Sequence, residues 1–140
     1  MSEKPLLTPY LNFNGETAEA MRFYKSALGG DLTMQTYGEA KMGKGDAENA
    51  RIIHAALRSD MITLMAADGP LDRTTKSGDN IHLSLSGSGD KYLSDAFRAL
   101  SEGGKVDTPM AKQFWGDTFG MLTDKFGIHW MVNITAPPQK

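Results

Sequence analysis

Cysteine is absent from the 140 residues of the sequence. Its absence excludes disulfide scaffolds, thiolate metal sites and cysteine nucleophiles, and it suits a reducing compartment. No segment has the apolar run of about 18 residues that a membrane-spanning helix requires. The first ten residues also lack the apolar core of a signal peptide. These absences predict a cytoplasmic protein that has no membrane partner.

An excess of basic residues is missing as well. Lys and Arg together number 15, and Asp and Glu number 17, which gives a formal net charge of −2. A protein that binds nucleic acid through its phosphates needs a basic face, so no nucleic-acid partner is expected. Hydrophobic residues make up 40% of the chain, as in ordinary globular proteins. We therefore expect one folded domain over residues 1–140.

The sequence contains an internal repeat. FYKSALGG at residues 23–30 is echoed by FRALSEGG at residues 97–104. Each block ends a segment whose apolar residues recur at helical spacing, and its glycines can end that helix in the left-handed conformation. One segment of alternating polarity precedes each helix and three follow it, which is typical of strands. The expected strands cover residues 6–14, 31–38, 51–59, 61–67, 80–87, 105–110, 117–124 and 128–134. This order predicts an α+β fold of two βαβββ modules, at about residues 5–67 and 80–135.

Three stretches of the chain carry a family resemblance. They are TPYLNFNG with AMRFYKSALGG, then NIHLSLSG, and finally FWGDTFGMLTDKFGIHWMVNI. In these stretches the chain resembles the vicinal-oxygen-chelate superfamily, the glyoxalase, bleomycin-resistance and dioxygenase fold, and within it the PhnB-like branch. The resemblance implies that the two modules build a curled, mostly antiparallel sheet around a pocket. Because each curled module leaves open strand edges, we also expect a homodimer.

The resemblance also locates possible metal ligands. Metal-dependent members of the superfamily hold their ion with His or Gln from the first strand of each module and Glu from the last. Carried over to this sequence, the positions fall on Thr8, Leu64 or Met65, His82 and Met131. Apolar side chains cannot ligate a divalent cation, so one of the four positions keeps a ligand. We therefore predict no tightly bound metal and no other cofactor, with His82 and His129 as residual metal candidates.

Polar and aromatic side chains near the expected curl are candidates for a ligand pocket. Each has a plainer alternative: a histidine can be satisfied by neighbouring hydroxyl groups or water, and an aromatic ring can fill the core. For His54, lining the pocket and simple exposure are equally compatible with the pattern. The candidate pocket residues are Tyr10, Asn12, His82, Ser84, Trp115, Phe119 and Met131.

Three functions remain open at this level. The first is binding of a small molecule in the pocket without a tightly bound metal. The second is a divalent-metal-dependent lyase, isomerase or dioxygenase. The third is a structural or interaction module whose pocket has no ligand. Fold-level analogy does not decide among them, so whether the chain is an enzyme, and which residues would be catalytic, stays open.

Overall fold

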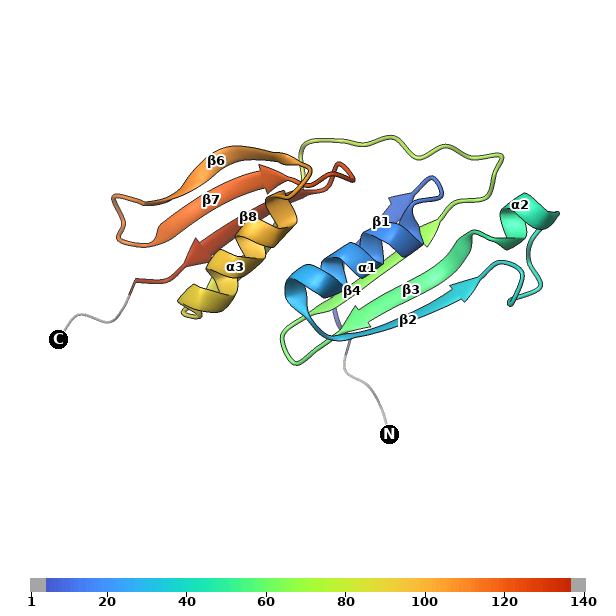
Figure 1. Cartoon of the computed structure of the whole chain (residues 1–140), viewed down its shortest axis with the longest axis horizontal. Coiled ribbons are helices and arrows are strands. Elements are labelled where there is room, and N and C mark those ends of the chain that lie inside the picture. The colour runs from blue at the N-terminus through green and yellow to red at the C-terminus, as the bar shows by residue number, and fades with distance from the viewer. Residues whose placement is uncertain (1–4, 137–140) are drawn as a thin grey trace. The chain divides into compact units, whose positions relative to one another are not determined.

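A computed structural model describes residues 5–136 of the chain (Figure 1). The chain divides into two compact units at the boundary between Thr75 and Lys76. We call the N-terminal part unit 1 and the C-terminal part unit 2. Each unit is one βαβββ module, in the order expected from the repeat.

Unit 1 forms a four-stranded sheet in the order β1-β4-β3-β2. β1 pairs with β4 in parallel, whereas the other neighbours are antiparallel. A short helix, α2, lies in the polar insertion after β2, where no helix was expected. The elements are β1 (Tyr10–Phe13), α1 (Thr17–Leu28), β2 (Asp31–Thr36), α2 (Asp46–Asn49), β3 (Ile52–Arg58) and β4 (Thr63–Asp68).

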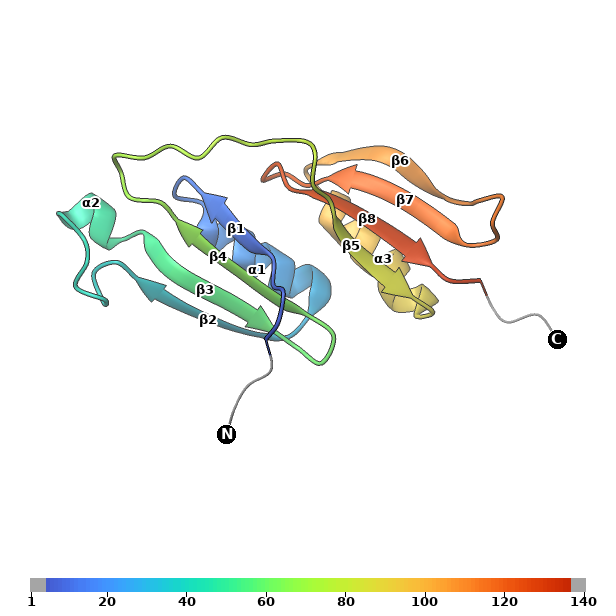
Figure 2. The same ribbon diagram turned by 180° about the vertical axis from the view of Figure 1, so that it is seen from behind.

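Unit 2 repeats this topology with the order β5-β8-β7-β6. β5 pairs with β8 in parallel, as β1 does with β4, and the other two pairings are antiparallel (Figure 2). The elements are β5 (Leu83–Gly87), α3 (Asp90–Ser101), β6 (Lys105–Lys112), β7 (Thr118–Thr123) and β8 (His129–Ile134).

The α+β class and the two repeated modules are therefore confirmed, and so is the mostly antiparallel pairing. The strands make two four-stranded sheets that are not closed. In each unit the first strand hydrogen-bonds to the last one, so the chain returns to its starting edge within a single module. Among the residues that the structure describes, no helix is long and apolar enough to span a membrane.

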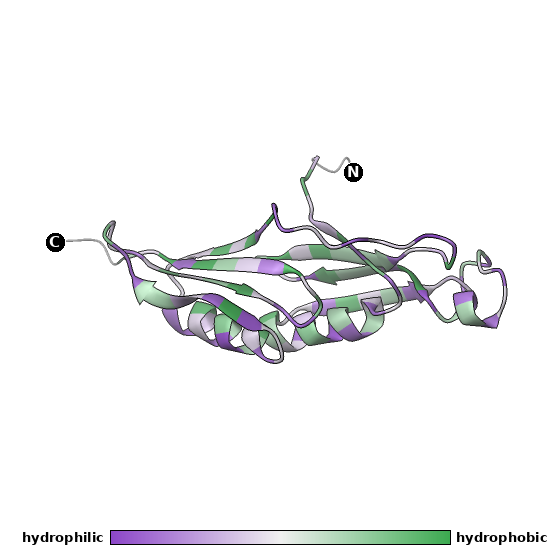
Figure 3. Ribbon diagram, turned by 90° about the horizontal axis from the view of Figure 1, so that it is seen from above, coloured by the Kyte–Doolittle hydropathy of each residue, from purple (hydrophilic) through white to green (hydrophobic). Residues whose placement is uncertain are grey.

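One helix covers one face of each sheet (Figure 3). α1 buries Ala20, Met21 and Tyr24 against the sheet of unit 1. In unit 2 the predicted helical stripe is buried in full. Its members are Leu93, Ala96, Phe97 and Leu100. Because these residues recur at i, i+3, i+4 and i+7, local periodicity alone orients α3 on its sheet.

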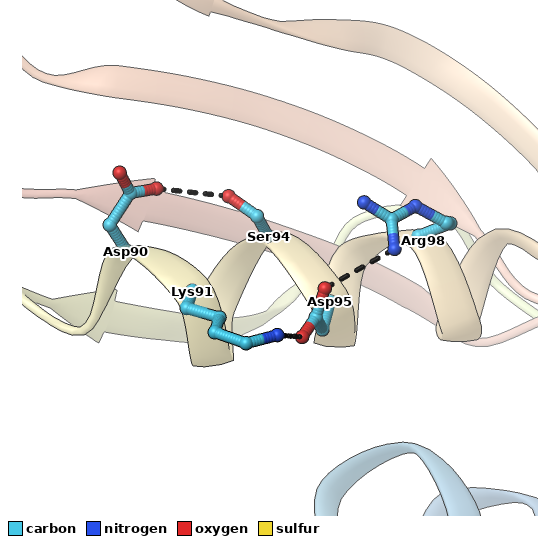
Figure 4. A network of polar contacts seen from close by, with 5 residues as sticks. All are labelled: Asp90, Lys91, Ser94, Asp95 and Arg98. Atoms are coloured by element: carbon cyan, nitrogen blue, oxygen red, sulfur yellow. Dashed lines mark hydrogen bonds and ion pairs between the residues drawn. The ribbon is translucent and has the colours of Figure 1, made fainter.

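The outer surface of α3 is polar. Asp95 accepts from Lys91 at 2.9 Å and from Arg98 at 3.2 Å, and Ser94 donates to Asp90 (Figure 4). The hydrogen bond from Lys91 and its charge, followed by the charge and hydrogen bond of Arg98, hold the pKa of Asp95 below its ordinary value. These side chains are solvent-exposed, so the network marks the solvated side of α3 rather than a site.

A buried carboxylate connects three segments of unit 1. Asp68, 2% exposed at the end of β4, accepts hydrogen bonds from the backbone N–H groups of Gly15, Thr17 and Ile52. It also accepts from the hydroxyl of Thr17 at 2.7 Å. The side chain thus ties the start of α1 and the start of β3 to the last strand.

Unit 2 has a buried carboxylate in a different place. Asp124, 3% exposed, follows β7 and accepts from the backbone N–H groups of Phe126 and Ile128. Its other oxygen accepts from the indole of Trp130 at 2.8 Å. Here the carboxylate shapes the turn between β7 and β8 instead of holding the helix.

Candidate functional site

Each sheet has one face that its helix does not cover, which we call the helix-free face. Side chains alternate along a strand, so the residues that face the helix and those that do not follow from the burial pattern. In β4, Leu64 and Ala66 are buried on the helix side, whereas Met65 and Ala67 are half-buried on the other. In β8, Trp130 and the later alternate residues face the helix in the same way.

The helix-free face of unit 1 has two central rows of side chains that cross all four strands. The cross-strand register gives their members. The first row is Tyr10, Met65, Ala56 and Thr33. The second row is Asn12, Ala67, His54 and Gln35. None of the eight residues is Asp, Glu, Lys or Arg.

Tyr10 and His54 are in contact across the intervening strand β4. The phenol oxygen lies 3.1 Å from Nδ1 of His54, and the ring centroids are 5.9 Å apart. Strands two places apart in a sheet are about 9.5 Å apart, so the tyrosine ring has to cross β4 to make this bond. The register pairs Ala55 with Ala66, and continuing it by one residue places Ala67 beside His54. The alanine side chain is small enough to leave room for that crossing.

The helix-free face of unit 2 has the same two rows with different side chains. The first row is Ser84, Met131, Met121 and Thr108, and the second is Ser86, Asn133, Phe119 and Ala111. Tyr10 pairs with Met65 as Ser84 pairs with Met131, so these two pairs occupy equivalent positions. Met121 accordingly stands where unit 1 has Ala56.

An ionisable cluster lies beside the first row of unit 2. The rings of His82 and His129 are 5.4 Å apart, which confirms the expectation that the first and last strands of this module bring them together. Nδ1 of His129 lies 2.8 Å from the hydroxyl of Thr123, which donates to Asp107 at 2.7 Å. Nε2 of His129 lies 2.9 Å from the carbonyl oxygen of Gly78.

The aromatic part of the candidate pocket lies at the turn between β6 and β7. Trp115 is 50% exposed and packs edge-on against Phe119 and Phe114, with centroids 6.2 and 4.9 Å away. Gly116 next to it has φ of 100°, a left-handed conformation that favours glycine. Trp115 is thus a surface residue beside the second row, not a core residue.

Asp117 anchors this aromatic turn to β8. Its carboxylate accepts from Nδ2 of Asn133 at 2.9 Å and from the backbone N–H of Ala136 at 2.8 Å, and it also bonds to the Trp115 side chain. The bond from Asn133, followed by the one from Ala136, lowers the pKa of Asp117 below its ordinary value. The carboxylate stays charged at neutral pH and fixes the end of β8 against the start of β7.

The residues at the superfamily's metal positions do not fit a divalent cation. The register places Met65 on the helix-free face next to Tyr10, which decides between the two residues considered for this position; Leu64 is buried on the helix side. Thr8 and Met65 therefore provide one neutral hydroxyl and a thioether, whereas His82 and Met131 provide one imidazole and a thioether. Such a donor set lacks the anionic oxygens or several imidazoles that replace the water shell of a hard or borderline cation.

His129 does not complete that set. Both of its ring nitrogens already lie within hydrogen-bond distance of Thr123 and Gly78, so a metal would have to displace one of these contacts. Within residues 5–136, no three His, Asp or Glu side chains gather closely enough to hold a metal ion.

The structure distributes the candidate pocket residues over the two helix-free faces. Tyr10 and Asn12 lie on that of unit 1. Those on unit 2 are His82, Ser84, Phe119 and Met131, with Trp115 beside them. A pocket that uses both faces stays a prediction. Sequence reasoning missed the contact of His54 with Tyr10, and it did not consider Gln35.

Comparisons with known proteins agree with this architecture. The model of the Glyoxalase/Bleomycin resistance protein/Dioxygenase superfamily matches residues 8–132. Protein YjdN of Escherichia coli is 31% identical over 142 residues, with 91% of this chain and 94% of that protein covered. The uncharacterized protein Rv0887c of Mycobacterium tuberculosis is also 31% identical, with 91% of this chain and 72% of that protein covered.

Solved structures show the same likeness. The crystal structure of PA1353 from Pseudomonas aeruginosa has a TM-score of 0.86 at 35% identity and covers 96% of this chain and 100% of its own. The PhnB protein of Bacillus cereus has a TM-score of 0.75 at 23% identity, over 94% of this chain and 100% of that one, which shows a shared fold. With its two βαβββ units and a family match over nearly its whole length, the chain belongs to the glyoxalase/bleomycin resistance protein/dioxygenase superfamily and has PhnB-like neighbours.

Proposed function

We propose that this protein binds a small organic molecule on its helix-free sheet faces without a tightly held metal ion. The observation that carries the proposal is the donor set at the superfamily's metal positions, where Thr8, Met65, His82 and Met131 offer one imidazole and no carboxylate. Polar groups nevertheless remain on both faces, since Asn12 and Ser84 are exposed there. A ligand that hydrogen-bonds and stacks suits such a surface better than a cation does.

The aromatic side chains support the same proposal. Tyr10 is 46% exposed on the face of unit 1, and Trp115 is exposed beside the face of unit 2. Exposed aromatic rings next to hydrogen-bonding groups are typical of sites for flat organic ligands. Met65, Met131 and Met121 add flexible apolar surface that adapts to different ligand shapes.

The experiment is an NMR titration of ¹⁵N-labelled protein with a panel of small aromatic and polar compounds. We expect at least one compound to shift amide signals in the strands that carry the two central rows, and not those on the outer surface of α3. If no compound binds, or if the shifts lie on the helices, the proposal is wrong and the interaction-module function is favoured. Binding that requires added zinc or manganese would favour the metal-dependent enzyme instead.

A second copy of the chain is the partner that we propose. β1 and β2 are the outer strands of one sheet, and β5 and β6 are those of the other. Within the described residues, each sheet therefore ends in backbone groups with no strand partner in its own unit. Exposed aliphatic side chains precede the first strand of each unit, Leu7 in unit 1 and Ile81 in unit 2. Sedimentation at high micromolar concentration tests this, and a persisting monomer would contradict it. The cysteine-free composition supports a cytoplasmic location.

A further inference from the structure

Resting on the proposed function, we propose that the helix-free face of unit 1 selects uncharged, planar ligands that carry an amide-type group. His54, Asn12 and Gln35 would recognise the polar atoms of that group, and the ring of Tyr10 would contact its flat face. The inference assigns a binding role to His54 and Gln35 and names the chemical class of the ligand.

The Tyr10–His54 contact fixes which proton the imidazole presents. A phenol is a stronger donor and a weaker acceptor than neutral imidazole, so we assign the hydroxyl of Tyr10 as the donor and Nδ1 of His54 as the acceptor across the 3.1 Å contact. In that assignment Nδ1 accepts a hydrogen bond and carries no proton, so the proton of the neutral imidazole is on Nε2. His54 thereby offers an N–H donor to a ligand's carbonyl oxygen.

Two amide side chains flank this donor in the same row. Gln35 is the cross-strand partner of His54, and Asn12 lies beyond Ala67 on the other side. Both are exposed, and neither forms a side-chain interaction with another of the described residues. Each offers one carbonyl acceptor and one NH₂ donor, which is the complement of an amide group.

Charge decides between an uncharged and an ionised ligand. The two central rows of unit 1 contain no Asp, Glu, Lys or Arg. The nearest cation along β3 is Arg58, one alternation beyond the first row, and its cross-strand partner is the acidic Asp31. A carboxylate ligand would leave water without meeting a cation inside the two rows, whereas a neutral amide has a smaller desolvation cost.

The shape of the rows favours a flat group. Ala56 and Ala67 are small, and the Tyr10 ring lies between the two rows as it reaches His54. In unit 2 the position of Ala56 is taken by Met121 and that of His54 by Phe119. The two central rows of unit 2 contain no histidine, so we apply the inference to unit 1 alone.

Benzamide and benzoate are the probes that test this inference, since they share a ring and differ in charge and in the amide group. NMR titrations at pH 7.5 should show benzamide binding at unit 1 at least fivefold more tightly than benzoate. Tyr10→Phe and His54→Ala should each weaken benzamide by about five- to tenfold, as expected for loss of one hydrogen bond. His54→Gln, which keeps a donor and an acceptor, should recover part of that loss.

Tyr92→Phe is the matched control, because it removes a tyrosine hydroxyl from α3 and should leave benzamide binding unchanged. Equal binding of the two probes, or benzamide binding that Tyr10→Phe and His54→Ala do not change, would overturn the inference while leaving the proposed function intact. If neither these probes nor any compound of the larger panel binds, the proposed function fails as well. Retained chemical-shift dispersion in each variant shows that it is folded.

Discussion

Unit 1 and unit 2 share one topology, yet their helix-free faces differ in chemistry. Across the rows, Tyr10 is matched by Ser84, Ala56 by Met121 and His54 by Phe119. At these positions unit 1 thus combines hydrogen-bonding rings with a small side chain, whereas unit 2 has a serine, a methionine and a phenylalanine. The two copies kept the strand register and diverged in the side chains that a ligand would meet.

The imidazoles differ in the same way. His54 has one hydrogen bond, to a tyrosine. His129 is held at both nitrogens in a chain that continues through Thr123 to Asp107. The first arrangement leaves one ring nitrogen without a partner among the described residues and the second does not, so histidines on equivalent sheet faces make different contacts.

The buried carboxylates extend the comparison to stability. Asp68 joins the helix, the third strand and the fourth strand of unit 1, whereas Asp124 shapes one turn of unit 2. A carboxylate that connects distant segments should contribute more to the free energy of unfolding than one that acts within a turn.

Asp68→Ala should have the largest effect. It leaves three backbone N–H groups and the Thr17 hydroxyl without their acceptor in a buried position. At about 1–3 kcal/mol for each buried donor left unsatisfied, and with some relaxation, we expect a loss of about 3–5 kcal/mol in the free energy of unfolding. Urea unfolding measures the loss, and hydrogen exchange should place it in unit 1. A loss below about 1 kcal/mol would show that Asp68 is not an anchor.

Asp124→Ala should come second, with a loss of about 2–3 kcal/mol. Two turn N–H groups and the Trp130 indole lose their acceptor, but all three donors lie within six residues of it, so the turn can relax locally. Hydrogen exchange in β7 and β8 reports the change. A larger loss than for Asp68→Ala would reverse the ranking and contradict the comparison.

Gly120→Ala should cost about 1–3 kcal/mol, the usual range for overpacking a core. Gly120 faces α3, and an added Cβ would lie 2.7 Å from the sulfur of Met110 and 2.9 Å from the ring of Phe97. Unit 1 already has an alanine, Ala55, at the equivalent register position. Gly69→Ala is the control, because its Cβ would meet nothing closer than 3.6 Å. Equal thermal stability of the two variants would be the contrary result.

Asp117→Ala should give the smallest effect and one that depends on pH. Its pKa is lowered from the ordinary 3.8 in the folded protein, so its stabilisation is complete above that value and is lost as the pH falls through the lowered pKa. The variant should be less stable than the parent at pH 7, and the difference should shrink below about pH 3.8. Urea midpoints at several pH values measure it, and a constant difference would exclude this cause.

Local patterns explain why much of the fold could be predicted. The stripe of Leu93, Ala96, Phe97 and Leu100 orients α3 through helical periodicity alone. Alternation in β8 places His129 and Met131 on one face, as the register confirms. The short helix α2 was not predicted. Its Glu48 accepts hydrogen bonds from the backbone N–H groups of Lys44 and of Leu71, and the contact with Leu71, 23 residues away, has no local sequence pattern.

The candidate site depended more on long-range contacts. Sequence placed Tyr10 and Asn12 on the polar side of one strand, but His54 lies two strands away in the sheet. The order of the strands in the sheet brings His54 next to Tyr10, and a local sequence pattern does not contain that order. The same holds for Asp107, which reaches His129 only through Thr123 on the adjacent strand.

The measurement that tests the central claim most directly is the metal content of the purified protein after mild dialysis. The account predicts far less than one divalent metal ion per chain, because Thr8, Met65 and Met131 provide no anionic ligand and His82 alone holds zinc only weakly. Elemental analysis of the parent and of His82→Ala should give the same low value. A nearly stoichiometric metal that disappears in His82→Ala would contradict the account and favour the metal-dependent enzyme.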